Sequence, residues 1–173
     1  METIASRCCF CLLLSALLLL SCASPIPDPL AALASPFRCE IGWQFDSTAF
    51  RATVSVTPAT EENARCETIL FLSPPALAGI CLTRSEGICT ATQDGIPLSD
   101  ADLSCWSEPL DLLSATAVGK KTAHTVYRGE SAISVQALQG DQPCTVILRE
   151  ADRLPLAIVG ERITLEVLWF CAT

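Results

Sequence analysis

A strict alternation of apolar and polar side chains in residues 50–57 constrains the fold more than any other feature. The segment reads Phe-Arg-Ala-Thr-Val-Ser-Val-Thr. A period of two places the apolar side chains on one face and the polar ones on the other, as in a strand with one buried face. Pro58 ends the strand because proline has no N–H to donate to a neighbouring strand. After a polar, acidic excursion the chain enters a second apolar run at Cys66.

The same pattern, short strand-like segments separated by turn residues, continues along the rest of the sequence. Further strands are expected at 39–45, 67–72, 80–83, 88–91, 110–118, 123–127, 131–138, 144–149 and 163–171. In the last strand, one face is expected to carry Ile163, Leu165, Val167, Trp169 and Cys171. Helical periodicity is confined to short turns after Thr60 and Ser99. This pattern predicts an all-β fold, an antiparallel β-sandwich with one or two short helical turns in its loops.

The N-terminal region has the pattern of a targeting segment. An uncharged apolar run, Cys8 to Leu20, is followed by small residues, so residues 1–23 are expected to be a cleaved signal peptide of a secreted protein. Residues 24–37 form a Pro-rich lead-in and 38–173 a single domain. An alternative stays open, because Leu-Leu-Ser-Cys at 19–22 loosely resembles a bacterial lipobox, in which Cys22 would become a lipidated N-terminus.

The cysteines of the mature chain are expected to form disulfides, as in other exported proteins. They are Cys39, Cys66, Cys81, Cys89, Cys105, Cys144 and Cys171. Cys81 and Cys89 are expected to pair across the turn between them. Because seven is odd, one thiol is left free or bridges to a second chain, whereas retention of Cys22 would give an even set. Zinc is disfavoured, since the mature chain has no C-x-x-C and the only histidine is His124.

Catalytic motifs find little support in this sequence. His124 lies within a strand pattern, and nothing near it in the sequence supplies the nucleophile and carboxylate of a triad. Residues 129–133 begin like a nucleophile elbow, but Ile133 stands where the second glycine belongs. We therefore expect a protein that is not an enzyme and that uses no cofactor or metal.

The charge balance favours a basic protein as partner. The net charge is −8, so nucleic acid and anionic membranes, which need basic patches, are poor partners. No basic residue occurs between Arg84 and Lys120. Within that interval, partner binding is expected from Asp100, Asp102, Glu108 and Asp111. Such an acidic face would steer a basic protein toward it.

Three segments together resemble the secreted β-sandwich immune-evasion proteins of poxviruses. They are the strand at 52–57 with its excursion to Cys66, the acidic segment 98–105, and the strand, turn and cysteine of 131–144. The resemblance implies a two-sheet sandwich that binds a host chemokine, cytokine or immune receptor.

The functional expectation is thus a secreted, non-enzymatic viral immune modulator that sequesters a host signalling protein. Two alternatives accompany it. One is a structural or envelope-associated protein, linked into dimers by its odd cysteine. The other is a bacterial lipoprotein anchored through Cys22.

Overall fold

The computed structural model describes residues 28–59, 64–98 and 104–173. Its strands are β1 (Phe37–Phe45), β2 (Thr48–Thr57), β3 (Cys66–Ser73), β4 (Ile80–Ser85), β5 (Ile88–Gln93), β6 (Ile96–Pro97), β7 (Thr116–Tyr127), β8 (Glu130–Gln139), β9 (Gln142–Arg149), β10 (Pro155–Val159) and β11 (Thr164–Ala172). Its helices are α2 (Ala31–Ala34) and α3 (Ser104–Leu113).

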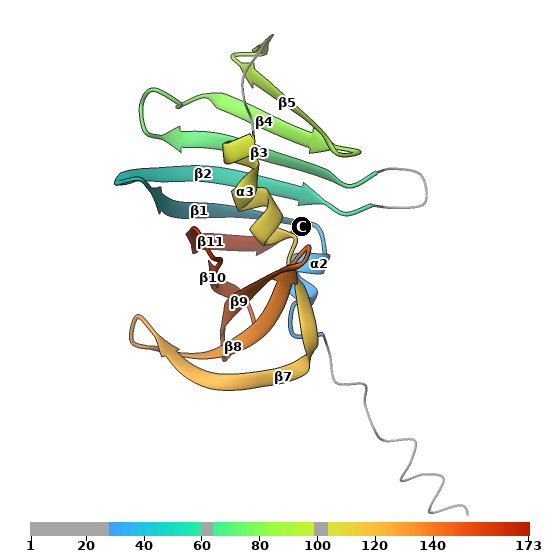
Figure 1. Cartoon of the computed structure of the whole chain (residues 1–173), viewed down its shortest axis with the longest axis vertical. Coiled ribbons are helices and arrows are strands. Elements are labelled where there is room, and N and C mark those ends of the chain that lie inside the picture. Colours follow the sequence, from blue (N-terminus) through green and yellow to red (C-terminus); the bar gives the residue numbers. More distant parts are fainter. Residues whose placement is uncertain (1–27, 60–63, 99–103) are drawn as a thin grey trace, which may run out of the picture.

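All the strands belong to one antiparallel sheet, in the order β6-β5-β4-β3-β2-β1-β11-β10-β9-β8-β7. Each half of the chain is a meander in which consecutive strands pair, and the pairing of β1 with β11 joins the two halves. Figure 1 shows the strands stacked along the long axis, with α3 lying across one face of the sheet. We call the face that carries α3 the inner face and the opposite one the outer face.

The inner face holds the core. Alternating residues of β1 and β2 are buried there, as the period-two pattern predicts, with Ala52 and Val54 fully inaccessible. The Trp43 ring stacks on Phe50 with centroids 5.2 Å apart. From α3 come Leu110, Leu112 and Leu113, all buried in the same core.

The expected sandwich is corrected to a single open sheet. The all-β, antiparallel class is confirmed, but α3 takes the place that a second sheet would have had. The reason lies in 104–118, where the expectation was a short helical turn followed by a strand. Leu110 and Leu113 are spaced as one face of a helix, so the helix continues through Leu113 and the strand begins only at Thr116.

A β-bulge in β11 corrects the expected face of the last strand. Ile41 pairs with Val167 and Cys39 with Phe170, so three residues of β11 span two of β1. The extra residue shifts the parity of the side chains. Phe170 therefore lies on the inner face with Cys39, whereas Trp169 is 51% exposed.

The expected disulfides are wrong for the cysteines that the structure describes. Free thiols are found at Cys39, Cys66, Cys81, Cys89, Cys144 and Cys171; Cys105 lies in α3, with its side chain outside the described part. Cys81 and Cys89 lie on opposite faces of the sheet. Cys81 is next to the inward-facing Leu82 in β4 and therefore faces outward. Cys89 pairs with Arg84, which faces inward like Leu82, so Cys89 faces inward too. Burial raises the pKa of the Cys39 thiol to about 12, which makes its thiolate scarce.

The lead-in and the connecting segments complete the fold. Leu30 and Leu33 of the Pro-rich region are buried at the edge of the core, one just before α2 and one within it. β10 begins at Pro155, which is tolerated as the first residue of a strand. The loop after β10 packs closely on α3, since a Cβ on Gly160 would lie 3.0 Å from Leu112 Cδ2. Among the described residues, no helix is long and apolar enough to cross a membrane.

We predict that reduction leaves the stability of this fold unchanged. The chain without residues 1–23 and with Cys105→Ser should melt at the same temperature with and without dithiothreitol, because its described thiols are free. Alkylation in denaturant without prior reduction should label all of them, as counted by mass. Loss of stability on reduction, of the size of one disulfide (about 2–4 kcal/mol), would contradict this.

Candidate functional site

A buried ion-pair network fixes the C-terminal end of α3 to the inner face of the sheet. Glu67 of β3 pairs across strands with Val56 on one side and Arg84 of β4 on the other, so both charged residues point to the apolar inner face. The Glu67 side chain is only 3% exposed. A carboxylate with so little access to water needs charged or hydrogen-bonding partners to be stable there.

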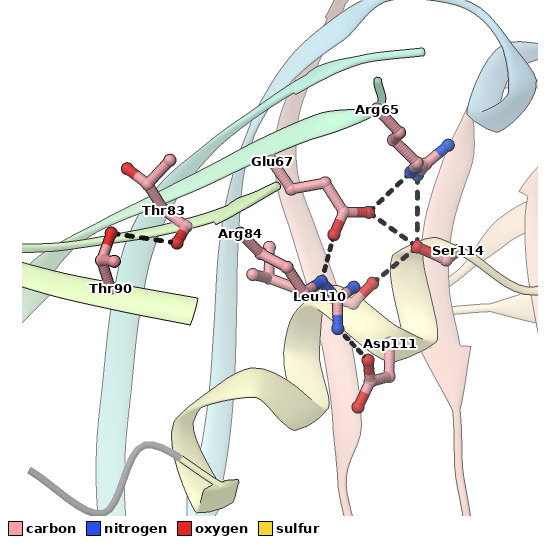
Figure 2. A network of polar contacts seen from close by, with 8 residues as sticks. All are labelled: Arg65, Glu67, Thr83, Arg84, Thr90, Leu110, Asp111 and Ser114. Atoms are coloured by element: carbon pink, nitrogen blue, oxygen red, sulfur yellow. Dashed lines mark hydrogen bonds and ion pairs between the residues drawn. The ribbon is translucent and has the colours of Figure 1, made fainter. Parts of the chain in front are cut away.

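Those partners come from three directions (Figure 2). Arg65 Nε donates to Glu67 Oε1 at 2.8 Å, and Arg84 Nε donates to Glu67 Oε2. Arg84 Nη1 also donates to Asp111 on α3. Ser114, just past α3, places its Oγ 2.8 Å from Glu67 Oε1. We call Arg65, Glu67, Arg84, Asp111 and Ser114 the helix clamp.

The electrostatics of the helix clamp favour its charged form. Burial by itself would raise the pKa of Glu67, but hydrogen bonds from Arg84, Arg65 and Ser114 outweigh it and hold the pKa below the ordinary 4.5. Burial likewise opposes the charge on Arg84, yet its bonds to Glu67 and Asp111 raise its pKa. Two guanidinium groups thus balance two carboxylates.

A hollow of about 570 Å³ with a mixed polar and apolar lining lies beside the clamp, between α2, the end of α3 and the start of β7. Its lining consists of Asp28, Pro29, Leu30, Leu33, Ala34, Arg65, Ser114, Ala115, Thr116, Ala117 and Gly119. We call it the α2–β7 hollow. It shares Arg65 and Ser114 with the helix clamp, and the Arg65 side chain is 33% exposed. Asp28 is held by the N–H of Leu30, which donates to its Oδ1 at 2.9 Å.

A second hollow of about 580 Å³ lies at the β1–β2 hairpin and the β10–β11 loop. Its lining includes Gly42, Ala49 and Leu168. The Arg51 and Glu166 side chains at this hollow are bound in ion pairs, to Glu40 and Arg128 respectively.

The acidic residues expected to bind a partner are not all described. Asp100 and Asp102 lie outside the described residues. Glu108 is 3.6 Å from Arg162 and only 19% exposed, and Asp111 belongs to the helix clamp. The two described carboxylates are thus partly neutralised, and a role in binding for the set of four stays a prediction.

The single imidazole lies at the surface, away from both hollows. His124 is 81% exposed, and its Nδ1 lies 3.1 Å from Glu150. In the described part of the chain, no group of three or more His, Cys, Asp or Glu is arranged to hold a metal ion.

Sequence reasoning missed the helix clamp, although one signal for it was present. Glu67 stands one residue into the apolar run that starts at Cys66 and has the parity of the inward Ile69. A carboxylate at a buried strand position requires a cation, and Arg84 has the same inward parity as Leu82 two residues before it. Sequence reasoning placed the acidic residues of this region in the polar segment before Cys66 and did not consider the carboxylate inside the strand.

We predict that Glu67→Gln destabilises the protein by about 3 kcal/mol at neutral pH, because it leaves Arg84 and Arg65 without their buried countercharge. Urea unfolding measures the difference. Glu40→Gln, which removes a carboxylate paired with the exposed Arg51, is the control and should cost less than about 1 kcal/mol.

The pH dependence of stability shows whether the charge of Glu67 or only the shape of its side chain stabilises the fold. The pKa of Glu67 is lower in the folded than in the unfolded protein. Its contribution to the free energy of unfolding is therefore present above pH 4.5 and is lost as the pH falls through the folded pKa. The difference in the free energy of unfolding between wild type and Glu67→Gln should therefore decrease below pH 4.5. A gap that stayed constant to low pH would show that the ion pairs do not stabilise the fold.

Comparison with known proteins reveals a likeness of fold only. No protein-family model and no curated protein matches the chain. An uncharacterized conserved protein from Thermus thermophilus superposes with a TM-score of 0.50 at 18% identity, over 83% of this chain and 82% of that one. MucB gives 0.48 at 18% identity; the match covers 83% of this chain but only 57% of MucB. A LolA superfamily protein from Nitrosomonas europaea gives 0.36 at 8% identity, over 85% and 94% of the two chains.

These matches overturn the resemblance to poxvirus immune-evasion proteins. The similar structures are bacterial, and MucB has been solved in complex with MucA. Residues 52–57 and 131–139 of the poxvirus segments are antiparallel strands of the open sheet, a pattern that many β-proteins share. The expected membership of the poxvirus family is therefore wrong, and the host chemokine or cytokine that it implied as ligand is withdrawn with it. The likeness that replaces it, to the protein from Thermus thermophilus, is one of fold alone.

Proposed function

We propose that this chain is a non-enzymatic binding protein of the bacterial cell envelope that holds the apolar part of an acidic amphiphile in the α2–β7 hollow. The observation that carries the proposal is the hollow itself, a space lined by both apolar and polar groups with an arginine at its rim. Its volume of about 570 Å³ falls in the range of small-molecule sites, roughly 300–1,000 Å³.

The lining of the hollow matches such a ligand in character. Ala34 of α2 and Ala117 of β7 offer apolar surface, and the buried Leu33 and Ala115 lie beneath it. Arg65 Nε and Nη2 are bonded to Glu67 and Ser114, and the exposed third of the side chain leaves room for a further acceptor. A guanidinium binds a carboxylate or phosphate through more than one N–H. The acidic group of the ligand is therefore placed at Arg65.

A binding role in place of catalysis is part of the same proposal. Among the described residues, the polar contact of the exposed His124 is with the Glu150 carboxylate and not with a hydroxyl or thiol that a histidine could activate as a nucleophile. In the helix clamp, Glu67 is bonded to Arg65 and Arg84, and its lowered pKa makes it unsuited to act as a general acid near neutral pH.

Attachment to the envelope is proposed to occur through Cys22. The sequence Leu-Leu-Ser-Cys at 19–22 follows an uncharged apolar run, and a short segment with prolines at 25, 27 and 29 separates Cys22 from α2. A lipid on Cys22 would place the protein at a membrane surface. With the viral interpretation removed, this alternative fits the bacterial likeness best.

A fluorescent fatty acid, cis-parinaric acid, tests the ligand site. It should bind the purified protein with a rise in fluorescence. Ala34→Trp fills the α2–β7 hollow and should weaken binding at least about fivefold, while Arg65→Gln should weaken it about tenfold, the size of one charge-assisted hydrogen bond. Ala49→Trp, an equal enlargement in the second hollow, is the matched control and should leave binding unchanged. Equal effects of the two tryptophans, or no binding, would refute the site.

Expression of the full chain in a bacterium tests the anchor. The wild-type protein should fractionate with membranes, and its N-terminal peptide should begin at Cys22 with the added mass of a diacylglyceryl group. Cys22→Ser should release the protein into the soluble fraction. An unmodified N-terminus at Ser24 would contradict lipid attachment and would leave the ligand site to be judged by its own test.

A further inference from the structure

The final strand of the sheet, β7, has an unpaired edge. It pairs with β8 on one side only and ends the strand order. In Figure 1 it lies at the lower end of the sheet, with no labelled element beyond it. Residues 122–127 pair regularly with 130–135 of β8 and are largely exposed. Every second residue of such an edge points its N–H and C=O away from the sheet.

Neither face of this part of β7 is covered. His124 and Val126 are 81% and 70% exposed, although they have the parity of the inner face. Within the described residues, no hydrogen bond reaches the outward backbone groups of 122–127. The edge is therefore accessible both to a new strand and to the side chains that such a strand would carry.

A bulge and two lysines define one end of this edge. Between Ala117 and Thr122, four residues of β7 lie opposite a single residue of β8, and Gly119 adopts a φ of +71°. This bulge ends the regular ladder. It also contains Lys120 and Lys121, the only lysines of the whole chain, and β7 carries no acidic residue.

At the other end of the edge, the charges are paired. Arg128 bonds to Glu166, and Glu130 lies 3.5 Å from Arg149. Beside the middle of the edge, His124 contacts Glu150. Among the described side chains of this edge, the positive charge without an ion-pair partner thus lies at the exposed Lys121, in a protein whose net charge is −8.

We infer that the β7 edge binds an extended peptide segment of a partner protein as an added antiparallel strand, with acidic residues following the paired segment. An antiparallel strand runs opposite to β7, so its C-terminal side reaches Lys120 and Lys121. Backbone hydrogen bonds supply affinity in this mode, and the side chains and charges supply selectivity. This site is separate from the α2–β7 hollow and does not require a ligand there.

A second copy of this chain fits the edge less well. Two copies that paired antiparallel over 122–127 would place Lys121 of one copy beside Arg128 of the other. Like charges at this position oppose pairing. Lysines on an edge strand protect against self-association in the same way. An acidic partner converts the same charges into attraction.

A labelled peptide of alternating threonine and valine that ends in a run of glutamates is the probe. Fluorescence anisotropy should detect binding that weakens with salt. The same peptide with lysines in place of glutamates, or with the glutamates at its N-terminal end, should bind less tightly. On binding, amide hydrogen exchange should slow at alternate residues of 122–127, which is the signature of strand pairing.

Charge reversal at the edge provides the matched comparison. Lys121→Glu should weaken peptide binding about two- to fivefold, the size of one exposed ion pair. Arg38→Glu reverses an exposed charge on β1, and it should leave the affinity unchanged. Four results would overturn the inference: no binding at millimolar peptide, equal binding of the glutamate and lysine peptides, protection outside 122–127, or protection that grows with protein concentration without peptide.

Discussion

One-sided burial is the constraint on which this fold depends. A single sheet with an apolar inner face must be covered, and in this chain the covering element in the middle of the sheet is the short helix α3 (Figure 1). A helix of this length has little stability by itself. Its position therefore relies on the burial of Leu110, Leu112 and Leu113 and on the helix clamp.

The helix clamp places charge where the core would otherwise be uniformly apolar. Apolar contacts alone allow a helix to slide or rotate on a sheet at small cost, whereas Glu67, Arg84 and Asp111 have to meet in one geometry. The same network holds Arg65 at the rim of the α2–β7 hollow. Helix position and the chemistry of the candidate site therefore share residues.

The alternation of apolar and polar residues predicted where strands occur, but it did not predict what covers the sheet or how distant strands pair. The alternation in 50–57 and 131–138 predicts one buried face; β2 has it, and β8 has it with Ala132 buried on the other face as well. That signal does not say whether a sheet or a helix covers the face, so the sandwich was a wrong extrapolation. The pairing of β1 with β11 joins the first strand to the last, and no local pattern encodes it.

The prediction of disulfides was wrong because it rested on the number of cysteines, while strand parity places Cys81 and Cys89 on opposite faces. The candidate site was hidden for a related reason, since only the strand pairing of Glu67 with Arg84 brings its residues together.

The bulge in β11 has an optical consequence. By shifting parity at one position, it places the indole of Trp169 in solvent, while Trp43 is buried against Phe50 and Phe71. Emission from an indole moves to the red as water gains access to it. The two faces of the sheet thus carry indoles in different environments: Trp43 reports on the core, and Trp169 on whatever approaches the outer face.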